Sequence, residues 1–295
     1  MSALTISAAV PLAAEQVMPH DARAIAVLIP GSGRIDRDGN ARGLALGIQR
    51  QLAEGLSERG VASIRWDKRG VGESGGDFLS SGLHDLVDDA LAVVDEVMGT
   101  GLPVVLIGHS EGTAIAARLL VERPDIAGAA LLAPYARNGL EVLRWQARGL
   151  QKDVPAVVRG ILRVMRTDLE TQTEKNRQRL LATTRDAERM GGAKINARWF
   201  REFMAYDPVA DLSLATQPVL AIASEFDLQS PPQDAAAIAA ARTAPTQHLT
   251  LNGLSHILRR QPTATLRTYR KDARRPIDER IVPLIVQWIA QLATP

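Results

Sequence analysis

The sequence predicts an α/β fold with a mostly parallel central sheet flanked by helices. Short, almost continuously apolar segments recur along the 295-residue chain, and a helical pattern of apolar residues follows each of them. Strands that are buried on both faces have this apolar composition, and their alternation with helices is typical of parallel strands joined by crossovers. A chain of this length holds about two domains, or one α/β domain with an insertion.

The predicted strands and helices alternate as parallel crossovers require. The apolar segments assigned to strands are Ala24–Pro30, Val61–Trp66, Pro103–Gly108, Gly128–Ala133, Pro218–Ala223 and Gln247–Leu251. Between them, Leu83–Met98 has apolar residues at helical spacing and is followed by Gly99 as a stop signal. An earlier predicted helix runs from about Arg42 to Arg59 and ends at Gly60 in the same way.

A long insertion separates the strand ending at Ala133 from the strand starting at Pro218. More than 80 residues lie there, whereas a simple crossover needs roughly 15 to 25. The pattern predicts helices throughout, over Leu140–Leu150, Val154–Met165, Thr171–Met190 and Ala197–Met204. We therefore expect a helical cap at 136–210 on a core formed by 1–135 and 211–295. A purely structural elaboration is the alternative.

Composition excludes several kinds of chemistry. Because cysteine is absent, disulfides, thiolate metal sites, iron–sulfur clusters and thiol nucleophiles are excluded. The net charge of +2 does not favour a nucleic-acid binder. Basic residues outnumber acidic ones by 15 to 9 in 136–210 and by 8 to 3 in 259–280. Interleaved acids and few aromatics favour a solvated face there over a surface for RNA or anionic membranes.

The sequence contains no candidate membrane span. No apolar stretch approaches the roughly 18 residues that a membrane helix needs. Residues 3–14 resemble a short signal-peptide apolar region, but no Lys or Arg precedes them. We therefore expect a cytoplasmic protein that acts on a small molecule, and nothing in the sequence determines its oligomeric state.

The best nucleophile candidate is Ser110, in Gly108-His109-Ser110-Glu111-Gly112, which fits G-x-S-x-G. A predicted strand, Val104–Ile107, comes directly before this motif, and a predicted helix, Thr113–Val121, comes directly after it. Such a strand–turn–helix elbow raises the serine hydroxyl above the sheet and presents helix N–H dipoles to developing negative charge. The alternative is an ordinary turn in which Ser110 caps the helix.

A serine hydroxyl needs a general base, and His256 is the best candidate among five histidines. It follows the last predicted strand, in a loop at the carboxyl edge of the sheet, where α/β active sites collect. His248 lies inside that strand, where a structural role is expected, and it stays the alternative base.

The acid that orients the histidine should leave the carboxyl end of another strand. The strand Pro218–Ala223 runs into Ser224-Glu225-Phe226-Asp227-Leu228. Asp227 lies further into the loop and is preferred, and Glu225, at the strand edge, is the reserve. In the alternative reading, either carboxylate caps the helix that starts near Pro232.

An oxyanion hole needs two preorganised N–H donors. The main-chain N–H of Glu111, next to the nucleophile, is one candidate. The other is that of Ser32, in the glycine-rich loop Pro30-Gly31-Ser32-Gly33 after the first predicted strand. A phosphate-binding loop is disfavoured because Asp36 breaks the G-x-G-x-x-G pattern and no Walker lysine follows.

On these motifs the chain resembles the α/β-hydrolase superfamily. The closest resemblance is to its bacterial serine hydrolases of the serine aminopeptidase and lysophospholipase-like branch. Gly31-Ser32-Gly33 followed by Asp36-Arg37-Asp38-Gly39-Asn40 is similar to the oxyanion loop of that branch. The chain order of the candidate residues, serine then aspartate then histidine, also matches the superfamily.

A second segment adds to the resemblance. Asp67-Lys68-Arg69-Gly70-Val71-Gly72-Glu73-Ser74 is similar to the D-x-R-G-x-G-x-S turn of the branch. The resemblance implies that Asp67 and Arg69 organise the fold. Pro30 stands where the branch usually has a histidine, which leaves the main-chain donor intact.

Taken together, these features predict a cofactor-free, metal-free serine hydrolase that cleaves carboxylic esters through an acyl-enzyme. Amide or peptide cleavage needs the same groups, and the motifs do not separate it from ester cleavage. Acyl transfer in a water-excluding site and a non-catalytic binding protein are the remaining alternatives.

Overall fold

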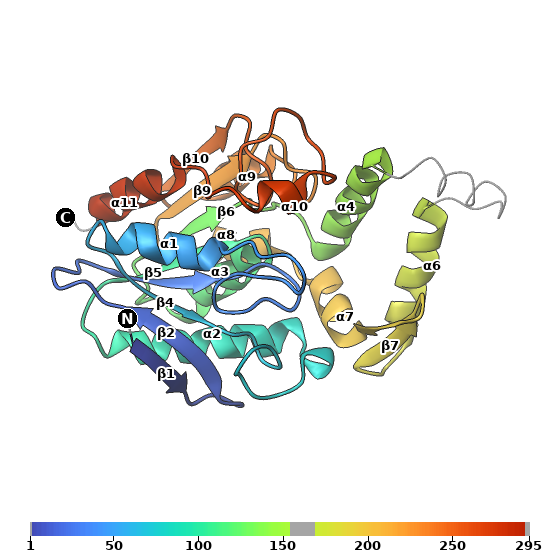
Figure 1. Ribbon diagram of the computed structural model, residues 1–295, viewed down its shortest axis with the longest axis horizontal. Coiled ribbons are helices and arrows are strands. Elements are labelled where there is room, and N and C mark those ends of the chain that lie inside the picture. The colour runs from blue at the N-terminus through green and yellow to red at the C-terminus, as the bar shows by residue number, and fades with distance from the viewer. Residues whose placement is uncertain (1, 154–168, 293–295) are drawn as a thin grey trace.

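The computed structural model describes residues 2–153 and 169–292, which form an α/β core with an insertion beside it (Figure 1). The core sheet has eight strands in the order β1-β2-β4-β3-β5-β6-β9-β10. Their bounds are Ser2–Ile6 (β1), Leu12–Val17 (β2), Ile25–Ile29 (β3), Ala62–Trp66 (β4), Val104–His109 (β5), Gly128–Leu132 (β6), Val219–Ser224 (β9) and Thr246–Leu251 (β10). In this sheet only β2 runs against its neighbours, so the predicted mostly parallel α/β fold is confirmed.

Helices cover both faces of the sheet. Those of the core are α1 (Ile48–Ser57), η1 (Phe78–Ser80), α2 (Leu83–Met98), α3 (Glu111–Glu122), α8 (Pro208–Leu214), α9 (Asp234–Ala241), α10 (Tyr269–Asp272) and α11 (Ile281–Leu292). Apolar side chains of α1 and α11 pack on one face, and those of α2, α3, α8 and α9 pack on the other. Among the described residues, no helix is long and apolar enough to cross a bilayer.

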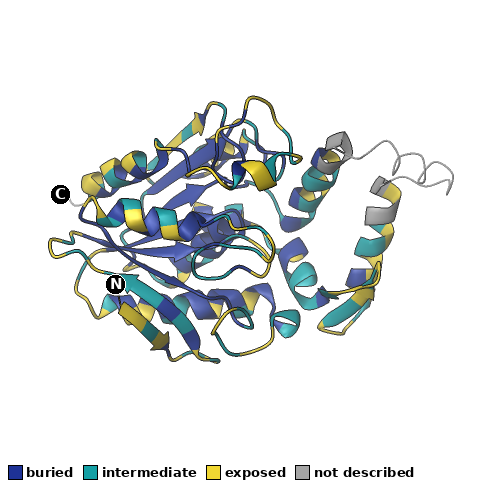
Figure 2. Ribbon diagram, in the orientation of Figure 1, coloured by how far each residue is buried: buried dark blue, intermediate teal, exposed yellow. Residues whose placement is uncertain are grey.

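The two-sided packing explains why the strands are almost continuously apolar. In β3, Ile25, Val27 and Ile29 enter the apolar cluster under α2 and α3, whereas Ala26 and Leu28 enter the cluster under α1 and α11. Figure 2 shows the central strands buried between the helical layers. Each strand therefore presents apolar side chains in both directions.

The amino-terminal hairpin was not predicted. Residues 3–14, which resemble a signal-peptide apolar region, contribute to β1 and β2, and β2 pairs antiparallel with β4. Strand β1 is largely exposed, and β2, with the sequence LAAEQV, has few of the β-branched and aromatic residues that favour strands. Pairing with β4 and burial of Leu12 and Ala14 stabilise β2, and neither is visible in local sequence.

The first predicted helix is shorter than its sequence pattern indicated. It begins at Ile48 instead of about Arg42, because Gly47 has a left-handed backbone with φ of 57°. The side chain of Asn40 accepts a hydrogen bond from the Gly47 N–H over 2.9 Å and holds this turn. The second predicted helix, Leu83–Met98, has the bounds that the sequence indicated.

The insertion is not helical throughout. Its elements are α4 (Gly139–Asp153), α6 (Leu169–Ala182), β7 (Ala187–Met190), β8 (Ala193–Asn196) and α7 (Ala197–Ala205). The predicted helix Thr171–Met190 is wrong beyond Ala182, because β7 and β8 form an antiparallel hairpin there. Gly191 and Gly192 both have positive φ, as a two-residue hairpin turn requires. The predicted helix Val154–Met165 lies outside the described residues.

The insertion is tied to the core through its last elements. The side-chain amide of Asn196 donates to the carbonyl oxygens of Phe78 and Ser81, both over 2.6 Å. Phe203 of α7 packs in the main apolar cluster of the core. Helix α8 crosses the boundary expected at residue 210 and also packs on the core. The division into core and cap stays a prediction.

Candidate active site

Ser110 occupies a sharp turn between β5 and α3. Its φ of 55° and ψ of −119° form a backbone conformation that is sparsely populated for residues other than glycine. A Cβ on Gly108 would lie 2.3 Å from the carbonyl oxygen of Gly112, and a Cβ on Gly112 would lie 2.3 Å from that of Ile29. The strand–turn–helix elbow therefore depends on both glycines of the motif.

Three buried side chains form a hydrogen-bonded chain at the carboxyl edge of the sheet. Ser110 Oγ lies 3.0 Å from His256 Nε2. His256 Nδ1 lies 2.8 Å from Oδ2 and 3.0 Å from Oδ1 of Asp227. Because the carboxylate only accepts, Nδ1 carries the proton and Nε2 is left to accept from the serine. The structure thus brings together the serine, histidine and aspartate that sequence analysis preferred.

The alternative residues lie elsewhere. Asp227 is held by the main-chain N–H groups of Gln229 and Ser230, which donate to Oδ1 over 2.7 and 2.8 Å. Glu225 is exposed and accepts instead from the N–H of Gly253 over 2.7 Å. His248 is exposed on β10, as its position inside a strand allowed. Neither alternative forms part of the hydrogen-bonded chain at Ser110.

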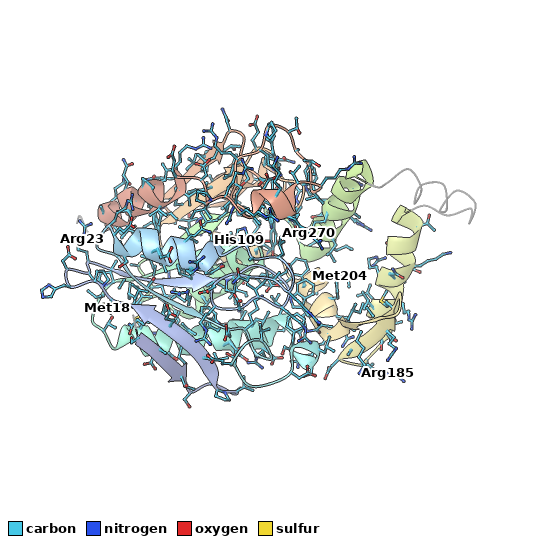
Figure 3. All side chains as sticks on the ribbon, viewed as in Figure 1. Met18, Arg23, His109, Arg185, Met204 and Arg270 are labelled. Atoms are coloured by element: carbon cyan, nitrogen blue, oxygen red, sulfur yellow. The ribbon has the colours of Figure 1, made fainter. Side chains whose placement is uncertain are left out.

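His109 is a site residue that sequence analysis did not select. Its ring is buried, and its Nε2 lies 2.8 Å from the main-chain carbonyl oxygen of His256, to which it donates. Burial, followed by the nearby His256 and Arg259, lowers the pKa of His109 to about 3, so the ring is neutral. Figure 3 shows His109 inside the core and Met204 on the insertion that lies beside the core. The one sequence signal was adjacency to Ser110.

The loop after β3 lies against the nucleophile candidate. A Cβ on Gly31 would lie 3.3 Å from Ser110 Cβ and 3.4 Å from His109 Nδ1. The backbone of this loop and the amino terminus of α3 therefore meet at Ser110. The main-chain N–H groups of Ser32 and Glu111 belong to these two segments, and their role as oxyanion donors stays a prediction.

A buried lysine joins the same two segments. Lys68 Nζ donates to the carbonyl oxygen of Gly31 over 2.7 Å and to Glu111 Oε1 over 2.8 Å. Lys68 and Glu111 are each only 2% exposed. Sequence analysis assigned neither side chain a role, although Lys68 lies inside the motif that begins at Asp67.

The charged residues on either side of Lys68 connect separate loops. Asp67 accepts from the side chain and main-chain N–H of Arg37 and from the N–H of Glu73. Burial raises the pKa of Asp67, but these hydrogen bonds outweigh it and hold the pKa below its usual value. Arg69 donates to both carboxylate oxygens of Asp89 on α2, over 2.7 and 2.6 Å. These contacts agree with the fold-organising role that the resemblance implies.

The carboxylates of the site are bonded to protein groups rather than grouped around an open position. Asp227 is bonded to His256, and Glu111 is paired with Lys68. Within residues 2–153 and 169–292, no group of three or more histidine and carboxylate side chains is arranged to hold a metal ion.

Comparison with known proteins identifies the family. A model of the serine aminopeptidase S33 family matches residues 44–263, well over half of the chain. The match includes Ser110, Asp227 and His256. No curated protein matches the sequence.

Several solved structures resemble the whole chain. Est1E from Butyrivibrio proteoclasticus with bound ferulic acid has a TM-score of 0.62 and 18% identity, over 98% of this chain and 96% of that chain. Mouse α/β hydrolase domain-containing protein 10 has a TM-score of 0.63 and 17% identity, over 99% and 98%. The esterase Pf2001 from Pyrococcus furiosus has a TM-score of 0.59 and 13% identity, over 98% and 92%. At these identities the likeness shows the fold, and together with the family match it leads to one conclusion: the chain is a hydrolase that belongs to the serine aminopeptidase S33 family of α/β-hydrolases.

Proposed function

We propose that the protein is a serine hydrolase that cleaves carboxylic esters, with Ser110 as nucleophile, His256 as general base and Asp227 as the acid that orients the imidazole. One observation carries the proposal. Ser110 Oγ lies 3.0 Å from His256 Nε2, while Asp227 bonds the opposite ring nitrogen. This arrangement supplies both the base and the group that fixes its tautomer.

In the first half of the reaction, Ser110 Oγ attacks the carbonyl carbon of the ester and His256 Nε2 takes the hydroxyl proton. The carbonyl oxygen becomes an oxyanion in the tetrahedral intermediate. The main-chain N–H groups of Ser32 and Glu111 stabilise it, each donor being worth on the order of 100- to 1000-fold in rate. The C–O bond to the leaving group then breaks, and the alcohol departs with the proton held by His256.

In the second half, water replaces the alcohol. His256 takes a proton from the water, the hydroxide attacks the acyl carbon, and the second tetrahedral intermediate collapses to release the acid. The proton returns from His256 to Ser110 Oγ. No redox step or cofactor is needed for this sequence.

The neighbours and the family name point to different bonds. Pf2001 is named an esterase, whereas the matching family is described as a serine aminopeptidase. An aminopeptidase must bind a free α-ammonium group, which favours an available carboxylate near the nucleophile. The two carboxylates bonded into this site, Asp227 and Glu111, already pair with His256 and Lys68. We therefore place ester cleavage first and aminopeptidase activity second.

The insertion at 136–210 is proposed as a cap that contacts the substrate. Its α4 approaches the loop that carries the proposed acid: Gln146 donates to the carbonyl oxygen of Gln229 over 3.3 Å. The enzyme is proposed to act on a small-molecule ester in the cytoplasm. Acyl transfer would appear as a product that contains an added alcohol or amine acceptor.

The nucleophile is tested by covalent labelling. A fluorophosphonate should modify Ser110 stoichiometrically, because its tetrahedral adduct mimics the oxyanion intermediate. Mass spectrometry of the proteolytic peptides locates the adduct. Ser110→Ala should not be labelled, and its kcat should be lower than that of wild type by roughly 10⁴- to 10⁶-fold. Modification of a different serine, or normal turnover by folded Ser110→Ala, would contradict the mechanism.

Bond type is tested with paired substrates. A series of p-nitrophenyl esters of increasing acyl length is measured beside aminoacyl p-nitroanilides, which release related chromophores. The proposal expects kcat/KM to be higher for at least one ester than for every anilide. The opposite ranking would support the peptidase and leave the assignment of Ser110 intact.

A further inference from the structure

Lys68 is a buried cation placed between the two segments that meet at the nucleophile. It is 2% exposed, and its ammonium bonds the carbonyl oxygen of Gly31 and the carboxylate of Glu111. The mechanism proposed above uses the main chain at both places and leaves the lysine without a role. Burying an ammonium group lowers the free energy of unfolding unless hydrogen bonds and an opposite charge compensate for the lost hydration.

The bond to Gly31 acts on the peptide unit that contains a proposed oxyanion donor. The carbonyl of Gly31 and the N–H of Ser32 belong to one planar trans peptide, so they point in opposite directions. An ammonium 2.7 Å from that carbonyl oxygen therefore determines where the N–H points. It also polarises the peptide, which strengthens the N–H as a donor. The loop is rich in glycine and needs such a restraint.

The bond to Glu111 acts on the other proposed donor. Glu111 is the first residue of α3, and its side chain is buried beside the same turn that carries Ser110. Among the described residues, its Oε2 has no hydrogen-bond partner, so the contact between Oε1 and Lys68 is its main compensation. An unpaired carboxylate there would repel the negative charge that develops on the substrate.

We propose that Lys68 is a positioning residue for the oxyanion hole: its ammonium aims the Gly31–Ser32 peptide at the reacting carbonyl and neutralises the Glu111 carboxylate. This inference rests on the proposed function, because it assumes that the N–H groups of Ser32 and Glu111 receive the oxyanion. It differs from a purely structural role, in which Lys68 only compensates a buried charge.

The test separates these two roles by removing the charges singly and together. Lys68→Met deletes the ammonium and leaves Glu111 buried without its partner, so both stability and kcat should fall. In the double variant Lys68→Met/Glu111→Gln, no buried charge is left uncompensated, so the melting temperature should recover. The restraint on Gly31 is still missing, so kcat should stay lower than wild type by about 10- to 100-fold, part of the value of one oxyanion donor.

Binding measurements give a readout that stability does not move. KM should change little in the double variant, because the oxyanion donors act mainly on the transition state. A trifluoromethyl ketone, which forms a tetrahedral adduct with the serine, should lose affinity by the same factor as kcat. A double variant that recovers kcat along with stability, or that loses affinity for substrate and ketone equally, would overturn the positioning role.

A neighbouring ion pair provides the matched control. Arg69, the residue after Lys68, forms a buried pair with Asp89, and this pair bonds neither Gly31 nor Glu111. The variant Arg69→Met/Asp89→Asn removes the pair. This variant also leaves no buried charge uncompensated, so both the melting temperature and the kcat of the folded enzyme should stay close to wild type. If both pairs lower kcat alike, Lys68 has no specific role.

The design also separates failure of this inference from failure of the proposed function. If wild-type enzyme shows no turnover or labelling that depends on Ser110, the proposed function itself is wrong. If wild-type enzyme turns over through Ser110 and the Lys68 variants behave like the Arg69 control, only the positioning role is wrong.

Discussion

The imidazole of His109 donates from Nε2 to the main-chain carbonyl oxygen of His256 over 2.8 Å, with the two ring centroids 5.2 Å apart. One buried histidine thus holds the backbone of the other. The Nε2–H group makes this bond while the ring is neutral. Burial opposes a second proton on the ring and is the main reason why the pKa of His109 falls to about 3.

Acid should destabilise the protein through His109. The unfolded chain takes up a proton near the ordinary value of 6.5, whereas the folded state resists it until about pH 3. The free energy of unfolding therefore falls as the pH drops below 6.5, by about 2 kcal/mol from this group at pH 5. His109→Gln lacks this group. The difference in free energy of unfolding between wild type and this variant, measured by urea denaturation, should therefore be smaller at pH 5 than at pH 8 by about 2 kcal/mol. His248→Gln makes the same substitution at an exposed histidine and is the control for the exchange of side chains itself.

The two carboxylates of the β9 loop should differ sharply in their effect on rate. Asp227→Asn leaves the imidazole in the wrong tautomer and should lower kcat by roughly 10,000-fold. Glu225→Gln alters an exposed side chain that bonds Gly253 and should cost far less. Steady-state kinetics on one ester compares the two variants. The reverse ranking would move the acid role to Glu225 and keep Ser110 and His256.

Asp67 should matter for stability through its hydrogen bonds to Arg37 and to the Glu73 N–H. Asp67→Asn leaves the partly buried Arg37 without its buried carboxylate partner and should lower the free energy of unfolding by about 3 kcal/mol. Because the folded pKa of Asp67 lies below its ordinary value of 3.8, its contribution is present above that pH and is lost as the pH falls through the lower folded value. Glu73 pairs with the same arginine but its side chain is 77% exposed. Glu73→Gln is the control and should change stability by no more than about 1 kcal/mol.

The insertion should determine substrate selectivity without contributing catalytic residues. Replacing residues 150–195 with a short glycine–serine linker keeps most of α4 and all of α7, including Phe203 in the core cluster. Labelling of Ser110 by a fluorophosphonate should persist, while the ranking of acyl lengths in the p-nitrophenyl series changes. An unchanged ranking in a folded, labelled variant would favour a purely structural insertion.

Local sequence predicted an element correctly where the residues of that element by themselves determine its conformation. The helix Leu83–Met98 has apolar spacing and a following stop signal, and the structure has the same bounds. The hairpin at Gly191–Gly192 was missed because its strands are only four residues long and mostly not buried, so no apolar alternation marks them. The amino-terminal hairpin was missed because β2 has few strand-favouring residues and is stabilised by its pairing with β4, which local sequence does not show.

For the site, the sequence by itself determined the family resemblance, the elbow at Ser110 and the preferred partners Asp227 and His256, because parallel strands bring their carboxyl ends to one edge of the sheet whatever their side chains. The tertiary structure decided which groups touch. The Lys68 ammonium reaches Gly31 and Glu111 across 37 and 43 residues of sequence, and His109 reaches the carbonyl of His256 across 147. Such contacts leave no local pattern, since they exist only once the strands have packed and buried the charges and rings between them.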